Sequence, residues 1–446
     1  MLGPDLTLRG AVELIRGGSL EALRLAEYCY GRIEELNDRL KAFITVFTRD
    51  ENTHSVSEPL LGAPISLKDL FYTKDKPTTA GSRILAGFKP SFNAPVVDAL
   101  SSSGALIIGK TNMHEFAFGV TNKNPHYGVC RNPWDRERIS GGSSGGSAVS
   151  VAAGMCLASL GTDTAGSVRI PASLCGVVGY KPTYGMVSAK GVIPLSWTLD
   201  HVGFLTRSVE DAALLMRITT SHRPPAEPLE YSIKPAELKG IRIGIPRNYF
   251  LEHLQEDVER VFYDVVDILQ REGAKVRDIT IEAVEQMVRV RYVIVHAEAA
   301  AYHKRFIRDR FNEYGEDLKR RLAEGAVIPA STYINAQRLR KKLVGSFRRV
   351  FKEVDILLTP TTAVTAPRVD EENVAVGDVV MDIRPALLRL TEPFNVVGAP
   401  VLSLPAGLSR ERLPVGLQAI ADVMDDDTLL SIGMALESVI KPIGNP

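Results

Sequence analysis

Two stretches of the sequence hold serines in settings suited to nucleophilic chemistry. The first, SGGSSGGSAVS over residues 140–150, is too rich in glycine and serine for an ordinary strand or helix. A phosphate-binding loop would need a lysine directly after the glycines, and none follows. Ser144 matches the G-x-S-x-G pattern of α/β-hydrolases, but the preceding residues 130–140 are charged and contain a proline, unlike the strand that this pattern requires.

The second stretch, LGTDTAGSVRIPASLCG over residues 160–176, places Ser167 directly after a Thr-Ala-Gly turn. Consecutive backbone N–H groups in such a turn can converge on the oxyanion of a carbonyl under attack. A serine beside them is placed to attack that carbonyl if a base removes its proton. The alternative is structural, because Ser167 could cap a helix that begins near residues 170–174. Both interpretations stay open on these residues alone.

The base that would serve such a serine is not fixed by the local sequence. None of the eight histidines has a context that singles it out. A buried lysine is the alternative, because burial favours the neutral amine, and a neutral amine can accept a proton. Lys68 lies in the apolar run PISLKD, but Lys110 and Lys181 also lie next to apolar runs. These neighbourhoods do not choose among the three lysines.

Cysteine spacing indicates neither a zinc site nor a disulfide framework, since no C-x-x-C pair occurs. The four cysteines are expected to be buried, reduced thiols. Cys175 could be a nucleophile only if its pKa were lowered, and its apolar neighbours would raise the pKa. The sequence HAE at 296–298 resembles the H-x-E of zinc deaminases, but no P-C-x-x-C follows.

Composition excludes several other classes of protein. The 53 basic side chains balance the 53 acidic ones, so no electrostatic footprint for nucleic acid is present. The arginine-rich stretch 338–353 repeats apolar positions at helical spacing and predicts a solvated helix face. The start shows no secretory signal, and the most apolar stretch, 148–161, is too short to span a membrane. We expect a soluble cytoplasmic protein.

Hydrophobic periodicity predicts alternating strands and helices. Residues 7–47 predict two helices joined near Gly17-Gly18, and 254–350 predict two or three long helices. The stretch 221–237, with four prolines, is the clearest boundary. This alternation is typical of α/β proteins with a largely covered sheet. Apolar runs typical of buried strands include residues 241–246, 355–362 and 399–407. Residues 62–73 predict a strand followed by a polar connection, and residues 105–119 predict a buried strand followed by a loop or short helix.

Taken together, the motifs resemble the amidase signature family over most of the chain. That family has an α/β fold with a large central mixed β-sheet covered on both faces by α-helices. The motifs that carry the resemblance are GAPISLKD, GKTNMHEFAFG, RNPWD, the run from SGGSSGGSAVSVAAG to LGTDTAGSVRIPASLCGVVGYKPTYG, LDHVGFLTRSVEDAALL, DILLTPTT, GAPVLSLPAG and LPVGLQ. We expect one amidase domain over residues 1–446, with N-terminal helices (1–60), a catalytic core (61–220), a proline-rich connection (221–238), a strand and a helical substrate-pocket insert (239–350), and C-terminal strands and a helix (351–446).

Carried over residue by residue, the resemblance implies a Ser-cisSer-Lys triad. Ser167 matches the nucleophile, and Lys68 matches the base. Ser143 matches the bridging serine, which in this family follows a cis peptide bond, here between Gly142 and Ser143. The family needs no metal or organic cofactor. The oxyanion hole is expected from the backbone amides of Thr164, Ala165, Gly166 and Ser167.

One position departs from the family pattern. The nucleophile loop often reads T-G-G-S, and here it reads T-A-G-S. Because alanine disfavours positive φ, Ala165 has an ordinary backbone or the oxyanion hole is altered. Asp163 and Arg169 are expected to pair as scaffold, with a substrate-carboxylate role for Arg169 as the alternative.

Two functions within the family compete. A free-standing amidase, acting on a small-molecule amide without nucleic acid or membrane, is favoured because HAEAAAYHKRF (296–306) lacks a tyrosine-rich segment typical of amidotransferase subunits. The alternative is the glutaminase A subunit of a tRNA-dependent amidotransferase. A non-catalytic scaffold is disfavoured because all three triad residues are present.

The N-terminal helices are compatible with a homodimer. Substrate-binding residues are expected at Met113, Phe116, Gly142 and Trp197.

Overall fold

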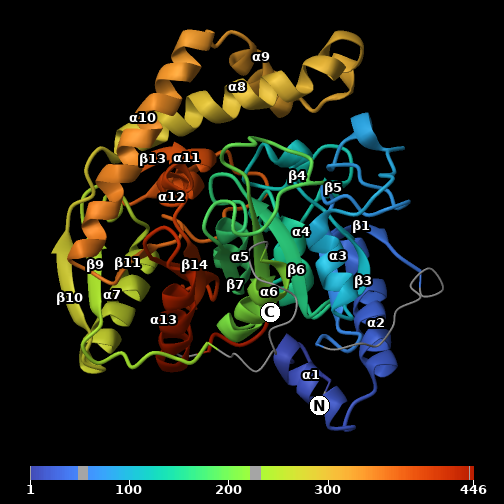
Figure 1. The fold of residues 1–446 in the computed structure, drawn as a ribbon, viewed down its shortest axis with the longest axis horizontal. Coiled ribbons are helices and arrows are strands. Elements are labelled where there is room, and N and C mark those ends of the chain that lie inside the picture. The colour runs from blue at the N-terminus through green and yellow to red at the C-terminus, as the bar shows by residue number, and fades with distance from the viewer. Residues whose placement is uncertain (1, 49–58, 221–232, 441) are drawn as a thin grey trace.

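Eleven strands form one mixed β-sheet in the computed structural model, which describes residues 2–48, 59–220, 233–440 and 442–446 (Figure 1). The strands at the centre and the edges come from both halves of the chain. Their order across the sheet is β1 (Phe43–Val46), β3 (Leu106–Thr111), β2 (Pro64–Lys68), β6 (Ala158–Asp163), β8 (His201–Thr206), β7 (Val178–Lys181), β14 (Val401–Leu408), β15 (Pro414–Ile420), β11 (Ile356–Pro360), β9 (Arg242–Pro246) and β10 (Lys275–Ile279).

The strand that carries Lys68 lies deep in this sheet. β2 pairs in parallel with both β3 and β6, while β6 pairs antiparallel with β8. Every residue of β2 and of β6 is buried. Strands that are covered on both faces read as continuous apolar runs, which is why the sequence indicated the strand at β2. The sequence analysis predicted no strand at β6. Lys68, at the end of β2, is fully buried.

Helices cover the sheet, and this confirms the predicted α/β class. The two predicted N-terminal helices are α1 (Leu8–Arg16) and α2 (Ala22–Leu40), with Gly17 ending the first. The others that pack on the sheet or on one another are α3 (Pro95–Ser102), α4 (Gly145–Ala152), α5 (Arg169–Cys175), α6 (Val209–Thr219), α7 (Glu256–Arg271) and α13 (Asp426–Val439). All residues of α4 and α5 are buried, so these two short helices form the centre of the structure.

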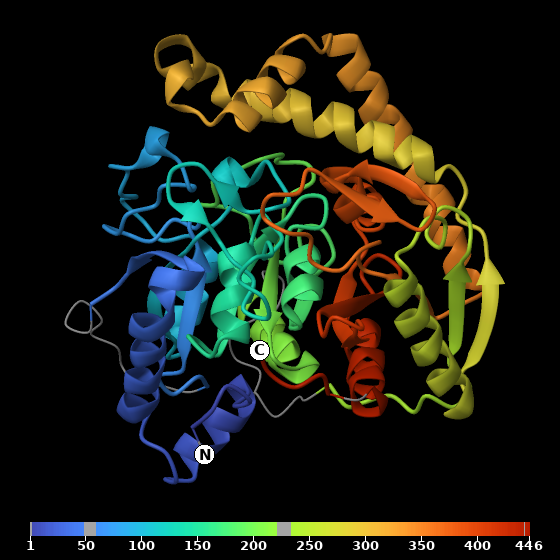
Figure 2. The ribbon, with the colours of Figure 1, turned by 180° about the vertical axis from the view of Figure 1, so that it is seen from behind.

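Three further helices form a layer along one side of the molecule (yellow and orange in Figures 1 and 2). They are α8 (Val284–Arg310), α9 (Glu316–Ala326) and α10 (Ala330–Arg348), and we call them the helical layer. α8 and α10 both contact α12 (Glu392–Val397), which follows α11 (Ile383–Leu388). The predicted solvated face at 338–353 falls on α10 and a 3-10 turn, η5 (Arg349–Lys352), and is largely exposed.

Small elements complete the loops above the sheet. They are the hairpins β4 (Lys123–Asn124) with β5 (Gly128–Val129) and β12 (Asn373–Val376) with β13 (Val379–Asp382), and the 3-10 turns η2 (Arg83–Leu85), η3 (Glu115–Ala117) and η4 (Phe311–Glu313).

Three further predictions, on the proline-rich connection, the cysteines and membrane-spanning segments, can be compared with the structure. The proline-rich connection over 221–238 lies mostly outside the described residues, which omit 221–232. All four cysteines are buried and free, as expected. Within the described residues, no helix has the length and apolar character needed to span a bilayer.

Candidate active site

Lys68 ends β2 and points its amine at a serine and a threonine. Its Nζ donates a hydrogen bond to Ser143 Oγ at 2.8 Å and another to Thr162 Oγ1 at 2.9 Å. The side chain is fully buried. Burial lowers the pKa of Lys68 to about 7, although the nearby carboxylates of Asp200 and Asp163 act in the opposite direction. Near neutral pH a large share of this amine is therefore unprotonated.

The other two candidate lysines are buried in different surroundings. Lys110 Nζ donates to the carbonyl of Phe71 at 2.5 Å and to two threonine hydroxyls. Lys181 Nζ donates to the carbonyl of Ala399. Burial lowers their pKa values to about 8 and about 7, respectively. Neither amine is bonded to a serine, so Lys68 is the lysine that the geometry selects.

A backbone hydrogen bond connects the loop that carries Ser143 to the turn that carries Ser167. The Gly142–Ser143 peptide bond is cis, as the resemblance implied. The carbonyl of Ser143 accepts the N–H of His114 at 3.2 Å, and the N–H of Ser144 donates to the carbonyl of Ser167 at 3.1 Å. Ser143 is fully buried, whereas Ser167 keeps 6% of its surface exposed. Of the two serines, Ser167 is therefore the one with some surface open to solvent.

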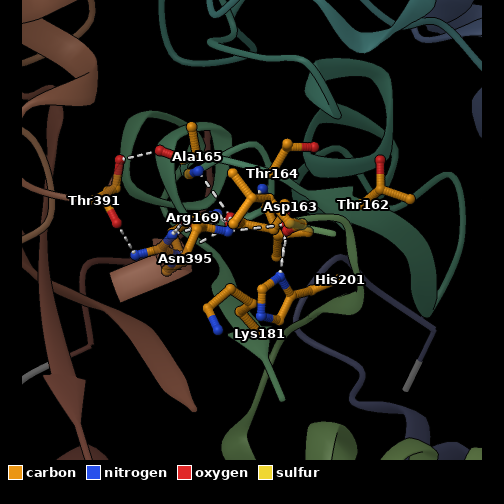
Figure 3. A network of polar contacts seen from close by, with 12 residues as sticks. Thr162, Asp163, Thr164, Ala165, Arg169, Lys181, His201, Thr391 and Asn395 are labelled. Carbon is orange, nitrogen blue, oxygen red and sulfur yellow. Dashed lines mark hydrogen bonds and ion pairs between the residues drawn. The ribbon is translucent and has the colours of Figure 1, made fainter. Parts of the chain in front are cut away.

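A buried carboxylate shapes the turn before Ser167 (Figure 3). Asp163 accepts the N–H of Gly166 at 2.8 Å and that of Val168 at 3.1 Å. Gly166 has φ of +131°, and a Cβ there would collide with the side chain of Thr391. Ala165 is not among the residues with positive φ, and its carbonyl accepts the Thr391 hydroxyl at 2.7 Å. Alanine at 165 therefore fits an ordinary backbone, which answers the question raised by T-A-G-S.

The hydrogen bonds to Asp163 also determine which backbone N–H groups of the turn are left to bind an oxyanion. The N–H of Gly166, one of the four predicted oxyanion-hole amides, is already bound to Asp163. Within the described chain, no acceptor pairs with the amides of Ala165 and Ser167. Helix α5 has Val168 at its N-cap and no side-chain cap bond. The alternative that Ser167 caps this helix is therefore wrong.

Arg169 has the structural role that the sequence predicted, pairing with Asp163, and the alternative role of binding a substrate carboxylate is wrong. Its guanidinium binds both oxygens of Asp163, each at 3.0 Å. The remaining N–H groups donate to the carbonyl of Thr391, to Gln418 Oε1 and to Asn395 Oδ1. Burial would raise the pKa of Asp163, but the charge and hydrogen bonds of Arg169, together with the charge of Lys181 and the hydrogen bond from Asn395, outweigh it and hold that pKa well below its usual range. All five donors are used, so none remains for a substrate carboxylate.

Histidine and cysteine do not supply the base or the nucleophile. His201 lies beside the turn, and its Nδ1–H faces the carbonyl of Asp163 at 3.2 Å (Figure 3). The same Nδ1–H donates to the carbonyl of Leu199 at 2.7 Å. Burial drives the pKa of His201 well below its usual value, and no described histidine side chain is hydrogen-bonded to either serine. Burial also raises the pKa of Cys175 well above its usual value, which leaves an inert thiol.

The four predicted substrate-binding residues fall in different environments. Phe116 is buried in an aromatic cluster, with its ring centroid 4.4 Å from that of His303 on α8. Met113 is fully buried, and Gly142 lies directly before Ser143. Trp197 is 47% exposed and is the one whose side chain is open to a ligand. Their roles in binding remain predictions.

Two residues of the site were missed by the sequence analysis. Thr162 lies on β6 opposite β2 and supplies the second acceptor for Lys68. Asp200 accepts a hydrogen bond from Thr164 Oγ1 at 2.6 Å. The motif LDHVG contains Asp200, and an acidic residue within an apolar run was the available signal. Thr162 gave none, because its partner is 94 positions away in the chain.

Known proteins share this fold and sequence over almost the whole chain. A family model described as Amidase matches residues 24–430. The A subunit of glutamyl-tRNA(Gln) amidotransferase from Chloroflexus aggregans (strain MD-66 / DSM 9485) is 37% identical over 97% of this chain and 96% of its own. A solved structure called an amidase superposes with a TM-score of 0.90 at 34% identity, covering 98% of this chain and 100% of its own. The amidotransferase protein of the same name from Thermotoga maritima, also a solved structure, gives 0.84 at 33% identity, covering 100% and 98%.

The fold and these relatives define an α/β enzyme that hydrolyses carbon–nitrogen bonds. The chain belongs to the amidase signature family. The names of its curated relatives favour the alternative, a component of an amidotransferase, over the free-standing amidase that the motifs favoured. Both functions share amide hydrolysis.

Proposed function

We propose that this enzyme cleaves its amide through an acyl-enzyme on Ser167. The observation that carries the proposal is the 2.8 Å hydrogen bond from Lys68 Nζ to Ser143 Oγ, on a loop whose next residue is bonded to the backbone of Ser167. Neutral Lys68 takes the proton of Ser143, and Ser143 takes that of Ser167 as its Oγ attacks the amide carbon. The free amides of Ala165 and Ser167 face the developing oxyanion, where one donor is worth about 3–4 kcal/mol.

The remaining steps reverse the proton path. As the C–N bond breaks, Ser143 returns a proton to the nitrogen, and ammonia or an amine leaves. Water then attacks the acyl ester, giving up a proton by the same path, and Ser167 recovers its hydrogen as the acid departs. Every proton is carried by Lys68, Ser143 or Ser167.

For the substrate, we propose the side-chain amide of glutamine, with ammonia passed to a partner protein. The support is the shared name of the relatives, which match almost their whole length. In this role the chain would work in the cytoplasm as the glutaminase component of a tRNA-dependent amidotransferase. The second candidate, a free-standing amidase, is supported by the higher TM-score of the solved amidase at nearly equal identity.

Ammonia release from a panel of amides tests both the chemistry and the substrate. The purified chain is assayed alone on glutamine, asparagine and simple aliphatic and aryl amides, beside Ser167→Ala. Ser167-dependent turnover confined to glutamine supports the amidotransferase role. Ser167-dependent turnover of simple amides, with glutamine excluded, would instead establish the free-standing amidase. Equal turnover by Ser167→Ala would overturn the acyl-enzyme on Ser167.

A further inference from the structure

A chain of buried hydrogen bonds leads away from the nucleophile turn. Thr164, three residues before Ser167, donates from Oγ1 to Asp200 Oδ1 at 2.6 Å. The same carboxylate accepts the N–H of Leu195 at 2.9 Å and the N–H of Ser196 at 3.1 Å. Asp200 thereby fixes the turn before Ser167 to the loop over residues 195–200.

That loop is in turn bonded to the helical layer. Ser196 Oγ donates to Glu298 Oε2 at 2.7 Å. Thr198 donates to the same carboxylate twice, from its N–H at 3.2 Å and from its Oγ1 at 2.7 Å. Glu298 lies on α8 and is 1% exposed. A continuous path of hydrogen bonds therefore leads from Thr164 through Asp200 and Ser196 to a helix of another layer.

A second helix of the layer completes the arrangement. Tyr333 on α10 donates its hydroxyl to Glu298 Oε1 at 2.7 Å. Gln337, one turn further along, donates to Thr198 Oγ1 at 3.2 Å and to the Tyr333 hydroxyl at 3.1 Å. Glu298 thus gathers donors from the 195–200 loop and from α10 at one point.

A buried carboxylate is a costly way to pack a helix against a core. Glu298 forms no ion pair with the residues that the structure describes. Hydrogen bonds from the 195–200 loop and from α10 surround its carboxylate, and the guanidinium of Arg340 acts on it only through a longer-range electrostatic attraction. An apolar side chain of similar size would pack there without that desolvation cost. A fully bonded polar group instead fixes geometry, because each bond has a preferred direction. Trp197, the exposed predicted substrate-binding residue, lies between the two loop residues that Glu298 holds.

We propose that Glu298 is a positioning residue for acylation: through Ser196 and Asp200 it holds Thr164, and hence the amides beside Ser167, in register with the helical layer. The inference rests on the proposed acyl-enzyme chemistry of Ser167. In this proposal the rate of acylation depends on Glu298, although Glu298 touches neither the substrate nor the triad residues.

An aryl fluorophosphonate tests this without knowledge of the natural amide. Ser167 Oγ forms a bond to phosphorus, fluoride leaves, and the serine proton passes to Ser143 and Lys68. The second-order labelling rate is measured with the full chain for the wild type, Glu298→Ala, Ser196→Ala and the double variant. Tm is measured alongside.

We expect each single variant to label about tenfold to a hundredfold more slowly, the loss typical of a hydrogen bond to a charged group. The double variant should be no slower than the slower single variant, because both break one path. Glu298→Gln keeps the shape and some of the bonds, so its rate should lie between those of the wild type and Glu298→Ala. It also serves if Glu298→Ala does not fold.

Asp211→Asn is the matched control. Asp211 is another buried carboxylate that accepts backbone N–H groups, those of Leu8 and Arg9 at the start of α1. This variant should lower Tm and label at the wild-type rate. If the Glu298 and Ser196 variants also lower Tm and label at the wild-type rate, or if their losses multiply, the positioning role is wrong. If the wild type is not labelled at Ser167, the proposed function fails and the inference falls with it.

Discussion

Residues 140–176 and the helical layer are stabilised in different ways. The first region holds the proposed catalytic serines, and we call it the catalytic loops. The loops carry small side chains, and every residue of α4 and α5 is buried. Their shape is fixed by backbone amides bound to Asp163 and by the ion pair of Asp163 with Arg169. In α10, by contrast, only Ala336, Leu343 and Phe347 are buried.

This contrast indicates where substitutions should be tolerated. In the catalytic loops one atom serves several purposes, since an oxygen of Asp163 binds both the turn and the guanidinium of Arg169. A substitution there should reduce the rate, the stability or both. In the helical layer most side chains meet solvent, and substitutions at those positions should be nearly neutral. The buried positions, eleven of them on α8 including Glu298, should be sensitive.

The largest effect is expected from Lys68→Met. Removing a general base costs about a hundredfold to ten-thousandfold in kcat/KM, while the apolar chain suits the buried site. In the wild type, kcat/KM should rise as the pH increases through about 7, because Lys68 with its pKa lowered to about 7 is the neutral base only above that pH. Ammonia release between about pH 5 and 9 measures both, a range that brackets this pKa. A profile that is flat through this range would contradict Lys68 as the base.

A large loss of stability is expected from Arg169→Met. The variant leaves the carboxylate of Asp163 buried without its cation, which typically costs about 3–5 kcal/mol. Urea unfolding followed by circular dichroism measures the change in the free energy of unfolding. A change below about 1 kcal/mol would show that the catalytic loops do not depend on this ion pair.

The smallest effect is expected from Arg308→Met on α8, the matched substitution in the helical layer. Arg308 is 90% exposed, and its nearest carboxylate, on Asp309, is 3.7 Å away and also exposed. Exposed pairs contribute about 0–1 kcal/mol, so the urea midpoint and ammonia release should both stay near the wild type. A loss comparable to that of Arg169→Met would erase the contrast between the two regions.

The sequence could predict elements whose signal is local. The apolar runs around Lys68 and residues 356–360 gave the buried strands, and helical spacing gave α1, α2 and α10. Choosing Lys68 over Lys110 and Lys181 required the family resemblance, because all three lie beside apolar residues and differ only in their distant partners.

The remaining features depend on pairings across the fold. Thr162 meets Lys68 only because β6 lies beside β2. The path from Thr164 to Glu298 spans separate layers, so no local pattern could reveal it. The suggestion that Ser167 caps α5 failed because Asp163 takes the N–H groups that a cap would bind.

Peptide mass spectrometry after labelling with an aryl fluorophosphonate tests the proposed triad most directly. One adduct is predicted, on the peptide that contains Ser167. It should be absent in Ser167→Ala and slow to form in Lys68→Met. An adduct on Ser143 or Ser144 in the wild type, or undiminished labelling of Ser167→Ala, would contradict Ser167 as the nucleophile.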